Sequence, residues 1–403
     1  MNDNMKEMEN SNIKKRAKKL RRKYNKLVFI IGLTAVICIV STYAWFIGIN
    51  VVTVQPIELS IKVSEGLLIS TTAKDAASFT NTIDLDLDNL VGTKLTDYTT
   101  NTNAVPGERG LKPISSIGKM DTTNNVLELY SKTSMTSTDG GYRIRANKID
   151  NATAEGSGYL AFDLFFKNAS GNTYRADYDR SEDEGIYLNT SSSITMSSSG
   201  EGGDGMENAV RVAFMQIGRV DHKTGYGAVA QGITCTTTSS VTGLCNVGAD
   251  ATHPLGRGAT YNIWEPNDTI HTQNAIAHFN TICKKRSASG DYTTDSCDSF
   301  TTSQYVTTYA LNSAIASSEN VDVYDALNGY TQSKFTAMEY YTDTNKNADA
   351  DVKTEFFYLA PNSITKVRVY LYLEGQDVDN YDLTSYGKTM KIQFAFSKNK
   401  VAE

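Results

Sequence analysis

A run of 23 residues without a single charge, positions 27–49, constrains this chain more than any other feature. The run is apolar and long enough to cross the hydrocarbon core of a bilayer, which takes about 20 residues of helix. Residues 1–26 before it hold ten Lys or Arg and three Asp or Glu. Positive charge beside a hydrophobic segment stays in the cytosol. We therefore expect a basic cytosolic tail at 1–26, one N-terminal hydrophobic helix in the membrane at 27–49, and an exported body at 50–403.

The basic tail could also bind nucleic acid or serve as a targeting signal. Its position directly before the hydrophobic run favours the membrane interpretation. Residues 27–403 carry 29 basic and 42 acidic side chains, so the body would repel a polyanion. We accordingly predict no nucleic-acid partner.

The hydrophobic run has two alternative fates. Its first fourteen residues, 27–40, have the length of a signal-peptide core. Thr42 and Ala44 would then stand at positions −3 and −1 of a cleavage site before Trp45. Uncut, the run would remain as a membrane anchor. Both fates place the body at the cell surface, either anchored or secreted to the extracellular matrix.

The exported body contains four cysteines in two local pairs, Cys235/Cys245 and Cys283/Cys297. An even number of cysteines in an exported chain predicts disulfides, for which three connectivities exist. Pairing between nearest neighbours would close two short loops. Zinc binding is the alternative, but neither pair has the CxxC spacing of a structural zinc site.

Strand patterns dominate the body. Ile57, Leu59, Ile61 and Val63 alternate with polar residues, as expected for a strand with one buried face. The clearest later strands are at 159–166, 209–217, 367–373 and 390–396.

These strands lie at both ends and in the middle of the body, so distant parts of the sequence must share one core. The pattern predicts a mainly β fold, a jelly-roll-like β-sandwich with long loop insertions, the largest at about 220–350. One or two short helices are expected, the first after an N-cap at Asp268 and running to Ile282, the second at 308–316. The Ser- and Gly-rich residues 190–205 predict a flexible loop.

Catalytic motifs are missing from the sequence. None of the four histidines stands in HExxH, and there is no GxSxG motif or phosphate-binding glycine loop. His271 and His278 would share a face of the first helix, but two turns apart they are too far from each other for one zinc ion. We expect that the chain is not an enzyme.

Acidic runs could bind calcium, which prefers several oxygen ligands on one loop. The best run lacks the glycine of an EF-hand loop at its sixth position, where Ala348 stands. Two looser acidic runs are 177–184 and 374–380, and for all three a solvated loop is the alternative. Calcium is thus the one cofactor that the sequence suggests. The candidate ligands of the best run are Asp343, Asn345, Asn347, Asp349 and Asp351.

Three segments carry a family resemblance. Residues 41–46, Ser-Thr-Tyr-Ala-Trp-Phe, resemble the signal-cleavage junction of TasA/camelysin-like exported proteins of Gram-positive bacteria. Residues 367–379, an apolar strand followed by Glu-Gly-Gln-Asp-Val-Asp, resemble a C-terminal signature of related surface proteins. Residues 263–267, Ile-Trp-Glu-Pro-Asn, are similar to the same group.

The resemblance implies an exported jelly-roll sandwich that can assemble into fibres, in which a freed N-terminal strand completes the sheet of a neighbouring subunit. Carried over, cleavage after Ala44 would release residues 45–63 as a donor strand for β-augmentation. The alternative is that this strand pairs within its own subunit. The basic tail is longer than a typical signal region, which favours an anchor. Camelysin has been described as a metalloprotease, but this chain has no zinc motif for that activity.

The leading hypothesis is a non-enzymatic cell-surface structural or adhesive protein, able to form fibres by self-assembly of identical subunits. The alternative is a membrane-anchored adhesin whose many tyrosines stack on a glycan or another ligand. An extracellular hydrolase is the third hypothesis, which the missing motifs argue against.

Overall fold

The computed structural model describes much of residues 50–403, and all described residues belong to the unit Ile49–Glu403. The predicted tail, the hydrophobic run and the junction residues Thr42, Ala44 and Trp45 lie outside the described residues. Among the described residues, no helix is long and apolar enough to cross a membrane. The described residues are 57–64, 66–86, 111–116, 118, 120–121, 126–138, 141–149, 158–171, 173–176, 182–196, 205–234, 238–243, 263–267, 270–273, 275, 284–286, 292–296, 313–315, 321–325, 329–330, 335–337, 341–346, 355–375, 377, 379 and 390–400.

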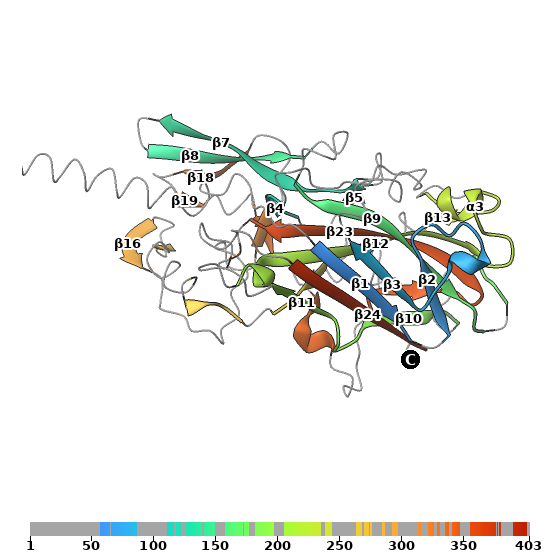
Figure 1. Ribbon diagram of the computed structural model, residues 1–403. Coiled ribbons are helices and arrows are strands. Elements are labelled where there is room, and N and C mark those ends of the chain that lie inside the picture. Colours follow the sequence, from blue (N-terminus) through green and yellow to red (C-terminus); the bar gives the residue numbers. More distant parts are fainter. Residues whose placement is uncertain are drawn as a thin grey trace, which may run out of the picture. The chain divides into compact units, whose positions relative to one another are not determined.

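Two mixed β-sheets form the fold, as the β-sandwich prediction requires (Figure 1). The smaller sheet has six strands. Their order is β22 (Phe357–Leu359), β10 (Glu184–Leu188), β24 (Met390–Lys400), β1 (Ile57–Val63) and β3 (Thr82–Asp86), and β11 (Ser193–Met196) also pairs with β24.

The larger sheet has twelve strands. The order along its main path is β19 (Gly329–Tyr330), β18 (Val321–Asp325), β8 (Gly141–Lys148), β7 (Tyr130–Thr138), β4 (Pro113–Ser115), β23 (Ser363–Glu374), β12 (Val210–Asp221), β14 (Ile263–Glu265) and β21 (Tyr341–Thr342). Three further strands join it: β9 (Leu160–Asn168) beside β23, β2 (Leu67–Ser70) beside β9, and β13 (Thr242–Gly243) beside β12.

Short elements complete the described structure. Helix α3 (Ala228–Gln231) covers one turn, and the 3-10 helices within the described residues are η1 (Ala76–Ser78), η4 (Met206–Ala209) and η7 (Asp343–Lys346). The two-stranded sheets are β15 (Lys284–Arg286) with β16 (Tyr292–Ser296), β17 (Ser313–Ile315) with β20 (Phe335–Ala337), and β5 (Met120–Asp121) with β6 (Val126–Leu127).

The strands predicted from alternation are confirmed, and distant ones do meet. Strand β1 pairs with β24 in parallel along its whole length, from Ile57 opposite Met390 to Val63 opposite Phe396. Strand β23 pairs with β12 and with β9, both antiparallel. Parallel pairs also join β4 to β23 and β14 to β21, so the sheets depart from an all-antiparallel jelly roll.

Two local predictions are wrong. Residues 313–315 form strand β17 where a helix was expected, because pairing with β20 outweighs their weak helical pattern. Residues 193–196 of the expected flexible loop form strand β11, because Ile194 fits into the sandwich core while exposed residues flank it. One residue of this low-complexity segment, Ile194, is therefore buried in the core.

The first predicted helix begins later than expected. Ile270, His271 and Thr272 precede the helical residues Gln273 and Ala275. The Thr272 hydroxyl accepts a hydrogen bond from the Ala275 amide at 3.2 Å, as an N-cap does. Thr272 thus takes the role predicted for Asp268.

The described part of the segment 220–350 contributes strands to the larger sheet. Strands β18 and β19 extend it beyond β8, whereas β14 and β21 extend it beyond β12. The predicted insertion therefore enlarges the sheet at both ends of its main path.

The disulfides predicted from the cysteine pairs are not found within the described part of the chain. All four candidate residues, Cys235, Cys245, Cys283 and Cys297, lie outside it. Lys284, the residue after Cys283, lies opposite Ser296, the residue before Cys297, in the pair of β15 and β16. Disulfides among these four cysteines stay a prediction, with all three connectivities open.

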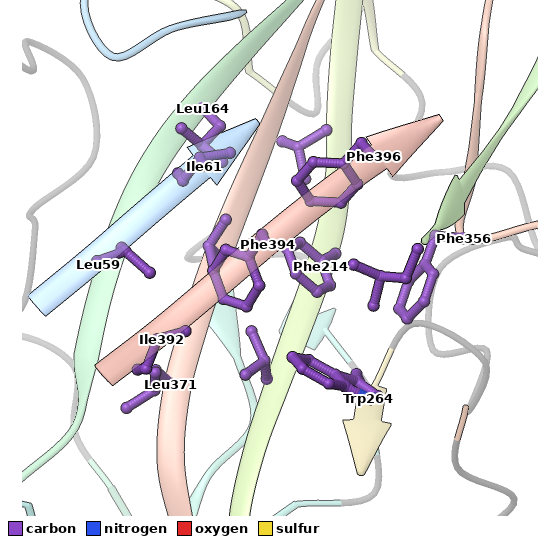
Figure 2. Close-up of a cluster of buried hydrophobic side chains, with 14 of the residues drawn as sticks. Leu59, Ile61, Leu164, Phe214, Trp264, Phe356, Leu371, Ile392, Phe394 and Phe396 are labelled. Atoms are coloured by element: carbon purple, nitrogen blue, oxygen red, sulfur yellow. The ribbon is translucent and has the colours of Figure 1, made fainter. Parts of the chain in front are cut away.

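The main core lies between the two sheets (Figure 2). Phe214 of β12 is its centre: its ring packs edge-on against those of Phe356, Phe394 and Phe396, with centroids 5.2, 5.3 and 5.5 Å away. Such arrangements add about 0.5–1.5 kcal/mol per pair to the burial of the rings. Other members of the core are Leu59, Ile61, Leu164, Trp264, Leu371 and Ile392.

A polar network fixes the end of β24 to the opposite sheet. The Lys398 Nζ donates to Asn168 Oδ1 at 2.9 Å, and also to the Ser170 hydroxyl. It forms an ion pair with Glu184 Oε2 at 2.9 Å. Burial alone would raise the pKa of Glu184, but the hydrogen bonds from Lys398 and Ser170 hold it below its usual value.

Replacing Phe214 with Ala should lower the free energy of unfolding by about 3–5 kcal/mol, because a large buried ring is lost and its neighbours cannot fill the space. The measurement is urea unfolding of the detergent-solubilised full chain. Asn399→Ala, an exposed change on β24, is the control and should stay within about 0.5 kcal/mol of the parent. A loss below about 1 kcal/mol for Phe214→Ala would contradict this packing.

Acidification should weaken the Glu184 network. Because the folded pKa is lowered, the stabilisation is present above the unfolded pKa and is lost as the pH falls through the folded pKa. Glu184→Gln should therefore lose less unfolding free energy than the parent between neutral and acidic pH. Glu182→Gln, at an exposed position two residues away, serves as the control. Equal acid sensitivity of the parent and Glu184→Gln would argue against the role of this pair.

Candidate functional site

Five buried side chains with titratable groups meet where β12 begins, β14 ends and β23 continues into a turn. We call this group the Arg211 cluster. Each member has at most 5% of its surface exposed. The members are Arg211, Glu265, His271, Asp377 and Asp379.

Strand geometry places Arg211 on the face of the larger sheet that is turned away from the sandwich core. Its neighbours Val210 and Val212 point into the core, and side chains alternate along a strand. Trp264 lies opposite Val212, so Glu265, the last residue of β14, lies close to the start of β12. Asp377 follows shortly after β23, which pairs with β12 through Leu373 and Val210.

The Arg211 guanidinium joins these segments. Its Nη2 donates to Glu265 Oε1 and to Asp377 Oδ2, both at 2.6 Å. Its Nη1 donates to the carbonyls of Asn208 and Val210 at 2.9 and 3.0 Å. Arg211 therefore holds two carboxylates from distant parts of the sequence against the start of its own strand.

His271 and Asp379 form the second half of the cluster. The distance between His271 Nδ1 and Asp379 Oδ2 is 2.7 Å. The Thr272 amide donates to Asp379 Oδ1 at 3.1 Å, and the Asp379 amide donates to Asp377 Oδ1 at 2.9 Å. These bonds fix the turn after β23 to the segment that precedes the short helix.

Gly205 allows this close approach. Its φ of +108° lies in a region that favours glycine. A Cβ atom at this position would lie 2.5 Å from Thr272 Cγ2 and 2.9 Å from Asp379 Oδ1. The turn before η4 must therefore have a glycine at this point.

Burial is the largest cause of the pKa shifts of Asp377 and of the neighbouring Tyr372. It raises the pKa of Asp377 to about 6, even though the charge of Arg211 opposes this shift. Tyr372 lies opposite Arg211 across β23 and β12. Burial, reinforced by the charge of Glu374, raises the pKa of Tyr372 well above its usual value.

Three members of the cluster could hold a metal ion. One potential ligand atom from each of His271, Asp377 and Asp379 lies within 4.8 Å of the other two. All three are buried, so an ion bound there would be enclosed by protein rather than presented to a substrate. The arrangement can therefore bind a cation and fix the surrounding turns.

Two of the segments that carry the family resemblance meet in this cluster. Glu265 comes from 263–267, and the two aspartates come from 367–379, which overlaps one of the looser acidic runs. Sequence reasoning missed the roles of Arg211 and His271. An arginine within the otherwise apolar run 209–214 was the available signal for the first, because a buried arginine needs carboxylate partners.

The predicted calcium loop is described only at its start. Asp343 Oδ1 accepts from the Trp264 indole at 3.0 Å and from Lys346 Nζ at 2.8 Å. Asn345 Oδ1 accepts from the Thr342 amide at 2.7 Å. The other candidate ligands, Asn347, Asp349 and Asp351, lie outside the described residues, so calcium binding stays a prediction.

The predicted donor strand is part of the core in its own chain. Leu59 and Ile61 of β1 are buried, and Val63 is partly buried against the same core. The backbone of Ile57 pairs with that of Met390. The sequence had left pairing within the subunit open as the alternative, and this is the arrangement of residues 57–63 in the single chain.

Removing the Arg211 guanidinium should be costly, because Glu265 and Asp377 would remain buried without it. We expect Arg211→Met to lower the free energy of unfolding by about 3–5 kcal/mol. Adding Glu265→Gln and Asp377→Asn should recover a large part of the loss, since neutral amides tolerate burial better than carboxylates. The measurement is urea unfolding at neutral pH. A triple variant less stable than Arg211→Met would contradict the charge argument.

Comparison with known proteins assigns no family to this chain. The chain matches no family model, no curated protein and no solved structure.

Proposed function

We propose that this chain is a non-enzymatic structural or adhesive protein of the cell surface, whose subunits assemble by exchanging strand β1. Export is supported by the basic residues 1–26 and the charge-free run 27–49. The membrane is the partner of that run, and identical subunits are the partners of the body. The resemblance of residues 41–46 to a cleavage junction supports release to the surface or matrix.

The observation that carries the proposal is the place of β1 in the smaller sheet. This first strand lies between β24 and β3 rather than at the edge (Figure 1). Ser60 lies opposite Gln393 on one side and Asp84 on the other. A sheet that needs its N-terminal strand in an interior position can take that strand from a second copy, because the same hydrogen bonds and core contacts form.

A short connection links β1 to the rest of the body. The Ser64 amide donates to the Phe396 carbonyl at 3.0 Å, and Gly66 has a φ of +78°. Strand β2 begins at the next residue, Leu67, and belongs to the other sheet. Residues 64–66 would be the hinge of an exchange. Opening them breaks the hydrogen bond from the Leu67 amide to the Ser64 carbonyl but leaves the pairing of β2 with β9.

Exchange can be tested with two single-cysteine variants of the full chain. The Ser60 hydroxyl donates to Asp84 Oδ1 at 2.8 Å across β1 and β3. We expect mixed Ser60→Cys and Asp84→Cys chains to form a disulfide-linked heterodimer, since the two new cysteines meet only when β1 of one copy enters the other. Peptide mapping of the dimer identifies the linked residues and separates them from the native cysteines.

Two controls define the result. Mixing Ser60→Cys with Lys223→Cys places the second thiol on an exposed turn after β12 and should give no specific dimer. The double variant Ser60→Cys/Asp84→Cys, oxidised as single subunits, should block assembly. Assembly into fibres by the locked double variant, or no heterodimer from the first mixture under fibre-forming conditions, would contradict strand exchange.

A further inference from the structure

His271, Asp377 and Asp379 come from two distant segments and present potential ligand atoms within 4.8 Å of one another. We propose that they bind one divalent metal ion of the zinc class, which acts as a structural centre between the turn after β23 and the segment at 270–275. This site differs from the predicted calcium loop at 343–351 and from the cysteine pairs. It is also independent of strand exchange.

The donor atoms select the type of ion. One imidazole nitrogen and two carboxylate oxygens suit zinc and similar first-row metals. Calcium prefers six to eight oxygen ligands, so the imidazole argues against it here. Three protein ligands leave a fourth position of a tetrahedral ion for a water molecule.

A surrounding set of hydrogen bonds orients the ligands. Asp379 Oδ1 accepts from the Thr272 amide, and Asp377 Oδ1 accepts from the Asp379 amide. Arg211 holds the other oxygen of Asp377. Metal sites commonly have such outer partners, which fix the carboxylates before the ion arrives.

The buried carboxylates around the site favour the binding of a cation. Glu265, Glu374, Asp377 and Asp379 are all buried around the end of β23 and the start of β12. Arg211 forms ion pairs with Glu265 and Asp377, and His271 contacts Asp379. A divalent ion would add positive charge beside Asp377 and Asp379, whose carboxylates are costly to bury.

Tyr372 adds a buried polar group beside Arg211. Its hydroxyl is buried and has no hydrogen bond within the described part of the chain. The ring lies opposite Arg211 across the strand pair and within electrostatic reach of Glu265 and Glu374. This hydroxyl lies on the Arg211 and Glu265 side of the cluster, where a water molecule would satisfy it.

Binding requires a small adjustment. His271 Nδ1 and Asp379 Oδ2 are 2.7 Å apart, which is a hydrogen-bond distance. Two ligands of one tetrahedral zinc ion lie about 3.4 Å apart, given bonds of about 2.1 Å. The two side chains must therefore separate by about 0.7 Å as the shared proton leaves.

The first test uses the full chain in detergent, with its cysteines alkylated and metal removed by a chelator. Thermal unfolding and calorimetric titration with zinc chloride should show one site and a raised melting temperature. His271→Gln should weaken zinc binding by more than about tenfold. His222→Gln, a histidine just beyond the opposite end of β12, should bind zinc like the parent. Equal zinc affinity in the two variants would overturn the assignment.

A second measurement uses the parent chain alone and so does not depend on the folding of any variant. Cobalt(II) added to the metal-free parent should give the visible absorption of a tetrahedral ion with nitrogen and oxygen ligands, and zinc should displace it. The spectrum is then recorded again with the cysteines free. The same bands, with no charge-transfer band from cysteine sulfur to cobalt, would support this site rather than cobalt binding by the cysteines. Absence of both the cobalt spectrum and the zinc-induced thermal shift in the parent would refute the proposal.

Discussion

The smaller sheet depends on the pairing of its first strand with its last. Strand β1 lies between β24 and β3, and its Leu59 and Ile61 face the aromatic rings of the core (Figure 2). Without β1, the smaller sheet would have two exposed edges where it now has continuous hydrogen bonding, and the core would lose two buried aliphatic side chains. The first strand of the described structure therefore also completes its core.

The two long strands β12 and β23 separate an apolar face from a charged one. Their core-facing residues pack against the smaller sheet, whereas the other face carries the Arg211 cluster and the group of Asp163, Lys366 and Arg368. Arg368 contacts Asp163 Oδ1 at 3.0 Å and holds this second group together. Buried charges of this kind give little net stability, but a broken pair is costly, so they favour one arrangement of the covering segments.

Period-two alternation was sufficient to predict the β-sandwich. It located the main strands because one face of each is buried, as Leu59 and Ile61 of β1 illustrate. It could not predict which strands pair, since the parallel contact of β1 with β24 joins residues more than 330 positions apart. The same limit applies to the site. The sequence marked 263–267 and 374–380 separately, but only folding brings Glu265 and Asp377 to the same guanidinium.

The most direct test of the central claim is hydrogen exchange of the β1 backbone in single subunits. An interior strand paired on both sides should exchange as slowly as β24, because its amides open only when the sheet opens. We therefore predict strong protection across residues 57–63 in the full chain. Exchange of these amides at the rate of an unpaired segment, while β24 remains protected, would contradict the account.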